Sequence, residues 1–446
     1  MPQENKRLKI VFAGVLIGVL FFVPPALLVP GLIAFLGFLF GVAMVKLYEK
    51  DRPAAVLKIF YSGFALRILL CLLLAWLAYR GKGNIFFLGA DDYGYALNAS
   101  SIVSAWKETG YLPGPNSLWW MPWAGDLNYT YLVAFLYYFI GEYYLMTLFL
   151  NCVFGSLTVI LIYFITRDIF GRRSALIASG LCAFWPSLIL WSTQNLKEPI
   201  TIFLAFFIFW LINKLKNSPG LIFYWVLLGL SVALIYKIRS SIAVVVIFAG
   251  FISLAVNYCS RKKRYILIIL GLSFLLVFLK WHSVSRLFNN YIGFPSCSVF
   301  EALNQAHQVR LWAAETAFLP DADISTPLTF VLNAPGFLLY ILFAPFPWAV
   351  TKLKHIFGTA EMLIWIVLFF FMLKGVALSI RYRLQESLFI LIFILVMILS
   401  FFGEGNVGTL FRHRALIWPV FFIFTAVGLS QDIGNSKKKI SRGGVL

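Results

Sequence analysis

The chain has 446 residues, of which 61% are hydrophobic and only 12% are charged. Soluble globular proteins are about a quarter charged, so this composition excludes a set of ordinary soluble domains and indicates that the bilayer is the solvent for most of the chain. The net charge of +19 would suggest nucleic acid as the partner of a soluble protein, but no nucleic-acid module is present. The basic residues instead predict cytoplasmic loops and contact with anionic membrane lipids.

Apolar segments recur along the whole chain, and a transmembrane helix needs about 20 such residues. Twelve segments are candidates: 10–28, 30–47, 58–79, 144–166, 174–192, 199–213, 221–237, 241–258, 265–280, 359–377, 387–402 and 415–430. Two further apolar segments, 128–140 and 328–349, are interrupted by Pro, Gly or polar residues, and we expect them to be re-entrant or interfacial. The prediction is an all-α polytopic membrane protein with about twelve transmembrane helices in a single domain, residues 1–446.

Basic clusters orient these helices, because short cytoplasmic loops are rich in Lys and Arg. With the N-terminus inside, alternation of the spans places every dense cluster on the same side: Lys46–Lys58, Arg167–Arg173, Lys214–Lys216, Arg261–Arg264, Arg381–Arg383 and the basic tail 431–446. Both termini are therefore predicted to be cytoplasmic. The opposite, extracytoplasmic face then carries the first large loop 80–130, the second large loop 281–327, and the shorter segments 193–198, 350–358 and 403–414.

Paired carboxylates open an amphipathic segment in the first large loop. Asp91 and Asp92 precede a stretch in which Tyr95, Ala99, Ile102 and Trp106 recur at helical spacing, which predicts a helix with one apolar face lying along the membrane surface. Acidic residues at a helix start are favoured by the helix dipole and by capping. Capping explains one aspartate; two at a membrane edge also suggest that one serves as a base.

Charged residues in the other outer segments break the positive-inside pattern. Glu198 precedes Pro199, a residue typical of the first helical position, so its carboxylate is expected at the start of a helix. Cations without matching anions suit a phosphate-bearing ligand, although contact with lipid headgroups is the simpler explanation for any one of them. The outer ionisable residues are Lys197, Glu198, Arg239, Arg310, Lys352, Lys354, His355, Arg412, His413 and Arg414.

The run Asp91-Asp92-Tyr93-Gly94-Tyr95 resembles the Asp-Asp/Glu-x-x-Tyr pattern in the first large outer loop of GT-C glycosyltransferases. The similarity is to the branch of protein mannosyltransferases and aminoarabinose transferases. It covers about residues 85–215, where a helix, an FGRR turn, a helix with a late proline and an outer Glu-Pro follow one another. The chain departs from that family in an extra apolar hairpin, 10–47, which leaves the acidic loop on the outer side.

The resemblance implies transfer of a sugar from a polyprenyl-phosphate donor to a lipid, glycan or protein acceptor at the extracytoplasmic face, with inversion. Asp91 would be the general base, and Asp92 would orient the acceptor or the donor sugar. Glu198 would hold sugar hydroxyls or a metal, and Tyr95 belongs to the substrate-binding set. The expected phosphate binders are Arg239, Lys352, Lys354, Arg412 and Arg414. The substrate-binding set also includes Lys197, Arg310, His355 and His413. No particular cofactor is indicated, and a divalent metal is compatible with acidic groups from two loops.

Two other functions stay open. An O-antigen-type polymerase or ligase would use a polyprenyl-pyrophosphate glycan and depend on Arg412 and Arg414. A lipid-sugar flippase or transporter would need ionisable residues near the bilayer centre, where the predicted spans are nearly free of acids. The family likeness favours a bacterial inner (plasma) membrane.

Overall fold

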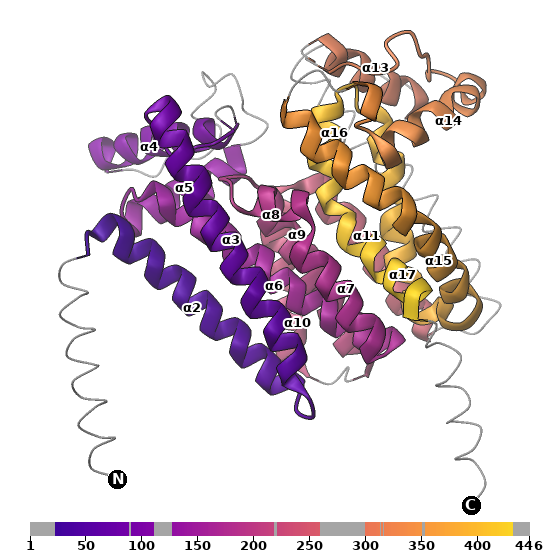
Figure 1. Ribbon diagram of the computed structural model, residues 1–446, viewed down its shortest axis with the longest axis horizontal. Coiled ribbons are helices and arrows are strands. Elements are labelled where there is room, and N and C mark those ends of the chain that lie inside the picture. Colours follow the sequence, from indigo (N-terminus) through magenta and orange to yellow (C-terminus); the bar gives the residue numbers. More distant parts are fainter. Residues whose placement is uncertain are drawn as a thin grey trace, which may run out of the picture. The chain divides into compact units, whose positions relative to one another are not determined.

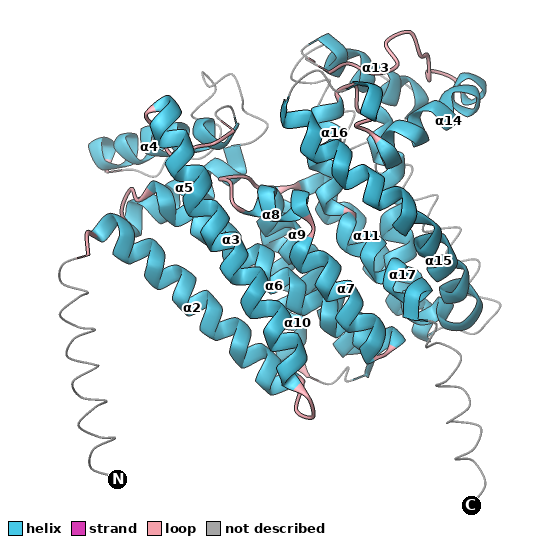
Figure 2. Cartoon of the chain, in the orientation of Figure 1, coloured by secondary structure: helices cyan, strands magenta, loops and turns pink. Residues whose placement is uncertain are grey.

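The computed structural model describes residues 23–88, 91–110, 127–217, 221–258, 299–312, 314, 316–349 and 353–430. All regular secondary structure in these ranges is helical, with one isolated antiparallel bridge and no strand (Figure 2). The predicted all-α fold class is therefore confirmed. The chain divides into two compact units, each of which is described by itself, and the single domain 1–446 stays a prediction.

The first unit comprises residues 1–53, 61–156 and 192–196. Its helices (Figure 1) are α2 (Pro25–Tyr48), most of α3 (Pro53–Lys82), α4 (Asp91–Thr109), α5 (Leu127–Ile140) and the first half of α6 (Tyr144–Phe170). The predicted amphipathic helix is confirmed as α4, which begins at Asp91 and buries one face. The buried residues are Asp92, Tyr95, Ala96, Ala99, Ile102, Val103 and Trp106.

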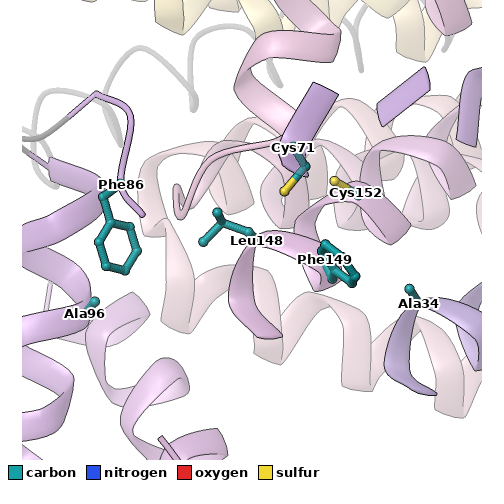
Figure 3. Packing of buried hydrophobic residues seen from close by; sticks show 7 residues of the cluster. All are labelled: Ala34, Cys71, Phe86, Ala96, Leu148, Phe149 and Cys152. Atoms are coloured by element: carbon teal, nitrogen blue, oxygen red, sulfur yellow. The ribbon is translucent and has the colours of Figure 1, made fainter. Parts of the chain in front are cut away.

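The core of this unit joins α4 to the long apolar helices α2, α3 and α6 (Figure 3). Phe86, which precedes α4, packs with Ala96 on that helix, and Leu148 on α6 belongs to the same buried cluster. Cys71 on α3 and Cys152 on α6 are fully buried free thiols in contact with each other. This packing fixes the start of α4, and with it the two aspartates.

The second unit comprises residues 54–60, 157–191 and 197–446. After the second half of α6, its elements are α7 (Arg172–Phe184), α8 (Pro186–Ser192), α9 (Glu198–Asn217), α10 (Ile222–Ile238), α11 (Ser240–Tyr258), α13 (Val299–Trp312), α14 (Pro327–Phe343), η3 (Pro347–Ala349), α15 (Leu353–Ser400), η4 (Phe401–Gly403), α16 (Val407–His413), η5 (Arg414–Leu416) and α17 (Trp418–Ser430).

Six described helices are long and apolar enough to cross a membrane, or eight if each of two bent pairs counts as one span. The pairs are α7 with α8, bent by 58°, and residues 407–416 with α17, bent by 63°. Together with the sequence composition, this identifies an integral membrane protein. The count of twelve spans stays a prediction; residues 10–22 of the first and all of 265–280 lie outside the described residues.

One ion cluster bears on the predicted orientation. Asp168 near the end of α6 lies 2.7 Å from Arg167 and 3.0 Å from Lys214 near the end of α9. These residues come from two segments that were predicted to share the cytoplasmic side. The structure brings the two segments together, as that topology requires, although which side they occupy stays a prediction.

α15 and α17 cross at two glycines. A Cβ built on Gly375 would lie 1.8 Å from the carbonyl oxygen of Phe424, and one on Gly428 would lie 2.0 Å from that of Phe371. The backbones therefore approach as closely as small residues permit in membrane helix pairs.

Replacing Gly375 by alanine is expected to lower the free energy of unfolding by about 1–3 kcal/mol, because the two backbones must separate. Thermal unfolding of the purified protein in detergent measures this loss. Gly180→Ala on α7 is the matched control, since its new Cβ would have no neighbour within 4 Å. Equal unfolding temperatures for both variants would contradict the close crossing.

Candidate phosphate-binding site

The first carboxylate of the site in the second unit is Glu198, the first residue of α9. Its side chain is only 1% exposed, and its Oε1 lies 3.5 Å from Arg239 and 3.4 Å from Arg412. Arg239 is the non-helical residue between α10 and α11, and Arg412 lies on α16. Three segments that are distant in sequence, all predicted to be extracytoplasmic, therefore meet at this carboxylate.

The second carboxylate is Glu404, which follows η4 and is 3% exposed. Its Oε1 lies 3.2 Å from Arg310 of α13 and 2.8 Å from Nδ1 of His413. Arg310 also donates to the carbonyl oxygen of Gly403 at 2.7 Å, and the ring of His307 contacts the carbonyl oxygen of Glu404 at 2.5 Å. These contacts hold α13 against the segment that precedes α16.

Buried charge explains the acidity of Glu404. Burial alone would raise the pKa of its carboxyl. The nearby His413 and Arg310 lower the pKa by more than burial raises it, so the pKa falls from the ordinary 4.5 to about 2. Arg239 also acts on Glu404, and His413 also acts on Glu198. The two carboxylates therefore belong to one electrostatic cluster.

Positive charge predominates in this cluster. The cluster contains four cations and two carboxylates, an excess of two positive charges. The cations are Arg239, Arg310, Arg412 and Lys197, the last of which acts electrostatically on Glu198. The carboxylates are buried, whereas Arg239, Arg310 and Arg412 keep 15%, 37% and 21% of their side chains exposed. Partly exposed cations held by buried acids suit an anion with several oxygens, such as a phosphate.

Each carboxylate also has an oxygen available to a donor. Oε2 of Glu198 and Oε2 of Glu404 are both buried and have no hydrogen-bond partner among the described residues. Buried polar atoms are normally hydrogen-bonded, so we expect each of these two oxygens to accept a hydrogen bond from a ligand hydroxyl or a water.

Glu404→Gln is expected to lower the free energy of unfolding at neutral pH by on the order of 3 kcal/mol, the value of a pKa depressed from 4.5 to about 2. A carboxylate with a depressed pKa stabilises the fold fully above its unfolded-state pKa, and this contribution is lost as the pH falls toward the folded-state pKa. The difference in unfolding temperature between wild type and variant should therefore shrink between about pH 4.5 and about pH 2. A difference independent of pH across that window would refute this role.

The two aspartates of α4, in the first unit, have different surroundings. Asp91 is exposed, whereas Asp92 is fully buried and accepts hydrogen bonds from the backbone N–H groups of Leu88 at 3.0 Å and Tyr93 at 2.9 Å. Asp92 therefore has the geometry of a residue that fixes the turn before α4. Asp91 is the more exposed of the two aspartates.

A buried polar network ties α4 to the turn at 193–196. Asn195 donates to the carbonyl oxygen of Asp92 at 2.9 Å and accepts from the hydroxyl of Tyr129 at 3.0 Å. Asn151 of α6 donates to the carbonyl oxygens of Gln194 and Leu196 at 2.6 and 2.9 Å. Tyr95 packs edge-on against the Tyr129 ring, 5.0 Å between centroids. Tyr95 is thus buried in this network, and its substrate contact stays a prediction.

The remaining predicted site residues are not part of the ion cluster around Glu198 and Glu404 as the structure describes it. Lys352 lies outside the described residues, and Lys354 and His355 lie on the first turn of α15 with side chains that are not described. Arg414 is fully buried, away from the exposed cations. Among the described residues, no three His, Cys, Asp or Glu side chains form a group that could hold a metal, and metal dependence stays untested.

Sequence reasoning missed two acidic residues. Glu404 is the acidic residue of the outer segment 403–414, which was singled out for its cations alone. Glu361 stands within an apolar run, and an acid inside a span is a signal for function.

The central segment of the chain, residues 127–282, matches the family model described as dolichyl-phosphate-mannose-protein mannosyltransferase. The predicted resemblance to protein mannosyltransferases is therefore confirmed over this segment. The matched segment contains Lys197, Glu198 and Arg239, whereas Asp91 and Arg412 lie outside it. No curated protein matches the sequence.

Two solved structures from Archaeoglobus fulgidus are similar at low identity. The apo oligosaccharyltransferase is 14% identical with a TM-score of 0.47, over 87% of this chain and 51% of that chain. The oligosaccharyltransferase AglB, in complex with an inhibitory peptide and a dolichol-phosphate, is 16% identical with a TM-score of 0.49, over 88% of this chain and 52% of that chain. The chain thus spans about half the length of either structure, and this likeness carries no argument about activity.

Proposed function

We propose that this chain is a membrane glycosyltransferase that moves a sugar from a polyprenyl-phosphate donor to a lipid, glycan or protein acceptor at the extracytoplasmic face. The observation that carries the proposal is the partly exposed cation cluster of Arg239, Arg310 and Arg412, held by the buried carboxylates of Glu198 and Glu404. The family model over residues 127–282, whose description names a dolichyl-phosphate-linked mannose, supports the donor class.

The chemistry needs positive charge at the phosphate. The acceptor oxygen forms a bond to the anomeric carbon as the bond from that carbon to the phosphate oxygen breaks, and the pair of electrons leaves with the polyprenyl phosphate. The departing phosphate gains a negative charge, which preorganised cations stabilise more strongly than they stabilise the donor. Arg412 and Arg239 are positioned for this because Glu198 holds them while their side chains stay partly exposed.

The acceptor hydroxyl must also lose its proton. A carboxylate can take it, and Asp91 is our proposed base because it is exposed, whereas Asp92 is occupied by backbone N–H groups. The orphan oxygens of Glu198 and Glu404 are the proposed acceptors for sugar hydroxyls. Direct displacement of the phosphate by the acceptor inverts the anomeric centre.

Binding of the donor's lipid phosphate tests the proposal. Native mass spectrometry of the purified protein in detergent would be carried out with undecaprenyl phosphate and, separately, with undecaprenyl pyrophosphate. We expect the monophosphate to bind. Binding of the pyrophosphate alone would contradict the proposed donor and favour the polymerase or ligase.

A further inference from the structure

Arg414 has a different environment from the other cations of the second unit. It is fully buried, one guanidinium nitrogen donates to the sulfur of Met362 at 2.8 Å, and the other donates to the carbonyl oxygen of Tyr340 at 3.1 Å. The guanidinium also lies over the ring of Trp418, 5.8 Å from its centroid. Arg414 is therefore enclosed by protein groups from three directions, and no face of it is open to a ligand.

The acid that compensates Arg414 is Glu361, on the first half of α15. Arg414 and Glu361 interact electrostatically, and Glu361 is only 2% exposed. Its carboxylate accepts from the backbone N–H of Ser187 at 2.7 Å and from the Ser187 hydroxyl at 2.8 Å. Each oxygen of this buried carboxylate thus has a donor.

These contacts hold the short segment that connects α16 to α17. Arg414 begins η5, the last part of residues 407–416, just before the 63° bend to α17. Arg414 bonds directly to Met362 of α15 and Tyr340 of α14, so this part of the chain is tied to two other helices at once. Ser187 of α8 in turn holds Glu361, the acid that acts electrostatically on Arg414. Buried charges are costly when either partner is lost, which makes this an effective anchor for the bend.

Arg412 lies two residues before the anchor. Residues two apart on a helix point about 200° away from each other, which agrees with a buried Arg414 and a partly exposed Arg412 that contacts Glu198. Movement of Arg414 would move the backbone that carries Arg412.

We propose that Arg414 and Glu361, with Ser187, form a positioning group that fixes residues 412–416, just before the 63° bend, so that Arg412 faces the phosphate of the donor. This inference rests on the proposed function. Arg414 was expected to bind the phosphate directly. In this proposal it acts through Arg412 and does not touch the phosphate.

The test compares undecaprenyl phosphate affinity with thermal stability. Arg414→Lys and Glu361→Gln are expected to weaken binding about tenfold, and Ser187→Ala, which removes only the hydroxyl bond, about threefold. The double variant Glu361→Gln/Arg414→Lys should bind undecaprenyl phosphate with the same affinity as whichever single variant binds it less tightly, because the two residues act as a unit. In an assay with the polyprenyl-phosphate-sugar donor, the KM for the donor should rise in the variants that lose affinity for the lipid phosphate. Arg381→Gln, an exposed cation of α15, is the charge control.

Ser187→Ala keeps the test decisive if the charged variants do not fold. Folded variants that bind the lipid as wild type does would overturn the inference and leave the proposed function intact. Loss of binding in Arg414→Lys alone, with Glu361→Gln and Ser187→Ala unaffected, would make Arg414 a direct ligand and also overturn it. Wild-type protein that binds no polyprenyl phosphate would overturn the proposed function and this inference with it.

Discussion

Replacing Arg412 by glutamine is expected to lower kcat/KM for the polyprenyl-phosphate donor by about 10²–10³-fold, the usual cost of removing one preorganised group that stabilises charge in a transition state. Arg412 combines partial exposure with an ion pair to a fully buried acid, Glu198. The variant should fold, because Glu198 keeps its contact with Arg239 at 3.5 Å. Initial rates with purified protein, together with lipid-phosphate affinity, measure the effect.

Two comparisons make the Arg412 result specific. Arg381→Gln removes an exposed cation from a segment predicted to be cytoplasmic, and it should leave the rate unchanged. Arg239→Gln should reproduce much of the loss, since Arg239 shares the same carboxylate. Wild-type kinetics in a folded Arg412→Gln protein would show that this cluster does not bind the reacting phosphate.

Asp91→Asn is expected to lower the transfer rate by about 10²–10⁴-fold, the range that a positioned general base contributes. Donor affinity should be unchanged, because asparagine keeps the shape of the side chain and loses only the ability to take the proton. Glu108→Gln is the matched control: it neutralises an exposed carboxylate on the same helix, α4.

The neighbouring aspartate should behave differently. Asp92→Asn replaces a carboxylate oxygen that accepts backbone N–H bonds before α4, so its main effect should be a lower unfolding temperature. If Asp91→Asn kept full activity while a folded Asp92→Asn protein lost it, the assignment of the base would be wrong.

Much of the architecture around the site could be predicted from residue patterns. The period of Tyr95, Ala99, Ile102 and Trp106 predicted α4 and its buried face, because an amphipathic pattern is a local property of the chain. Glu198-Pro199 likewise predicted the start of α9. The basic clusters also grouped segments that the structure brings together, as at Asp168 and Lys214.

Other features depend on tertiary packing. Which aspartate of the pair is buried depends on the contacts of α4, and adjacent residues give no sign of it. The 63° bend after residue 416 is marked in sequence only by Pro419, and the 58° bend of α7 and α8 only by Pro186. Proline cannot donate the helical hydrogen bond, but whether a break or a kink results is decided by neighbouring helices.

Charge pairing was the hardest part to predict. Glu404 and Glu361 each meet partners far away in sequence, and a single chain gives no means of assigning such pairs. The helical period could nevertheless have separated Arg412 from Arg414, since residues two apart cannot face the same ligand on a helix.

Mass spectrometry of membrane lipids and surface glycans from cells that carry the wild-type chain or Asp91→Asn tests the central claim most directly. The variant is expected to accumulate a polyprenyl monophosphate carrying a sugar and to lose a glycosylated product. Accumulation of a polyprenyl-pyrophosphate glycan, or identical lipid and glycan profiles from both cells, would contradict it.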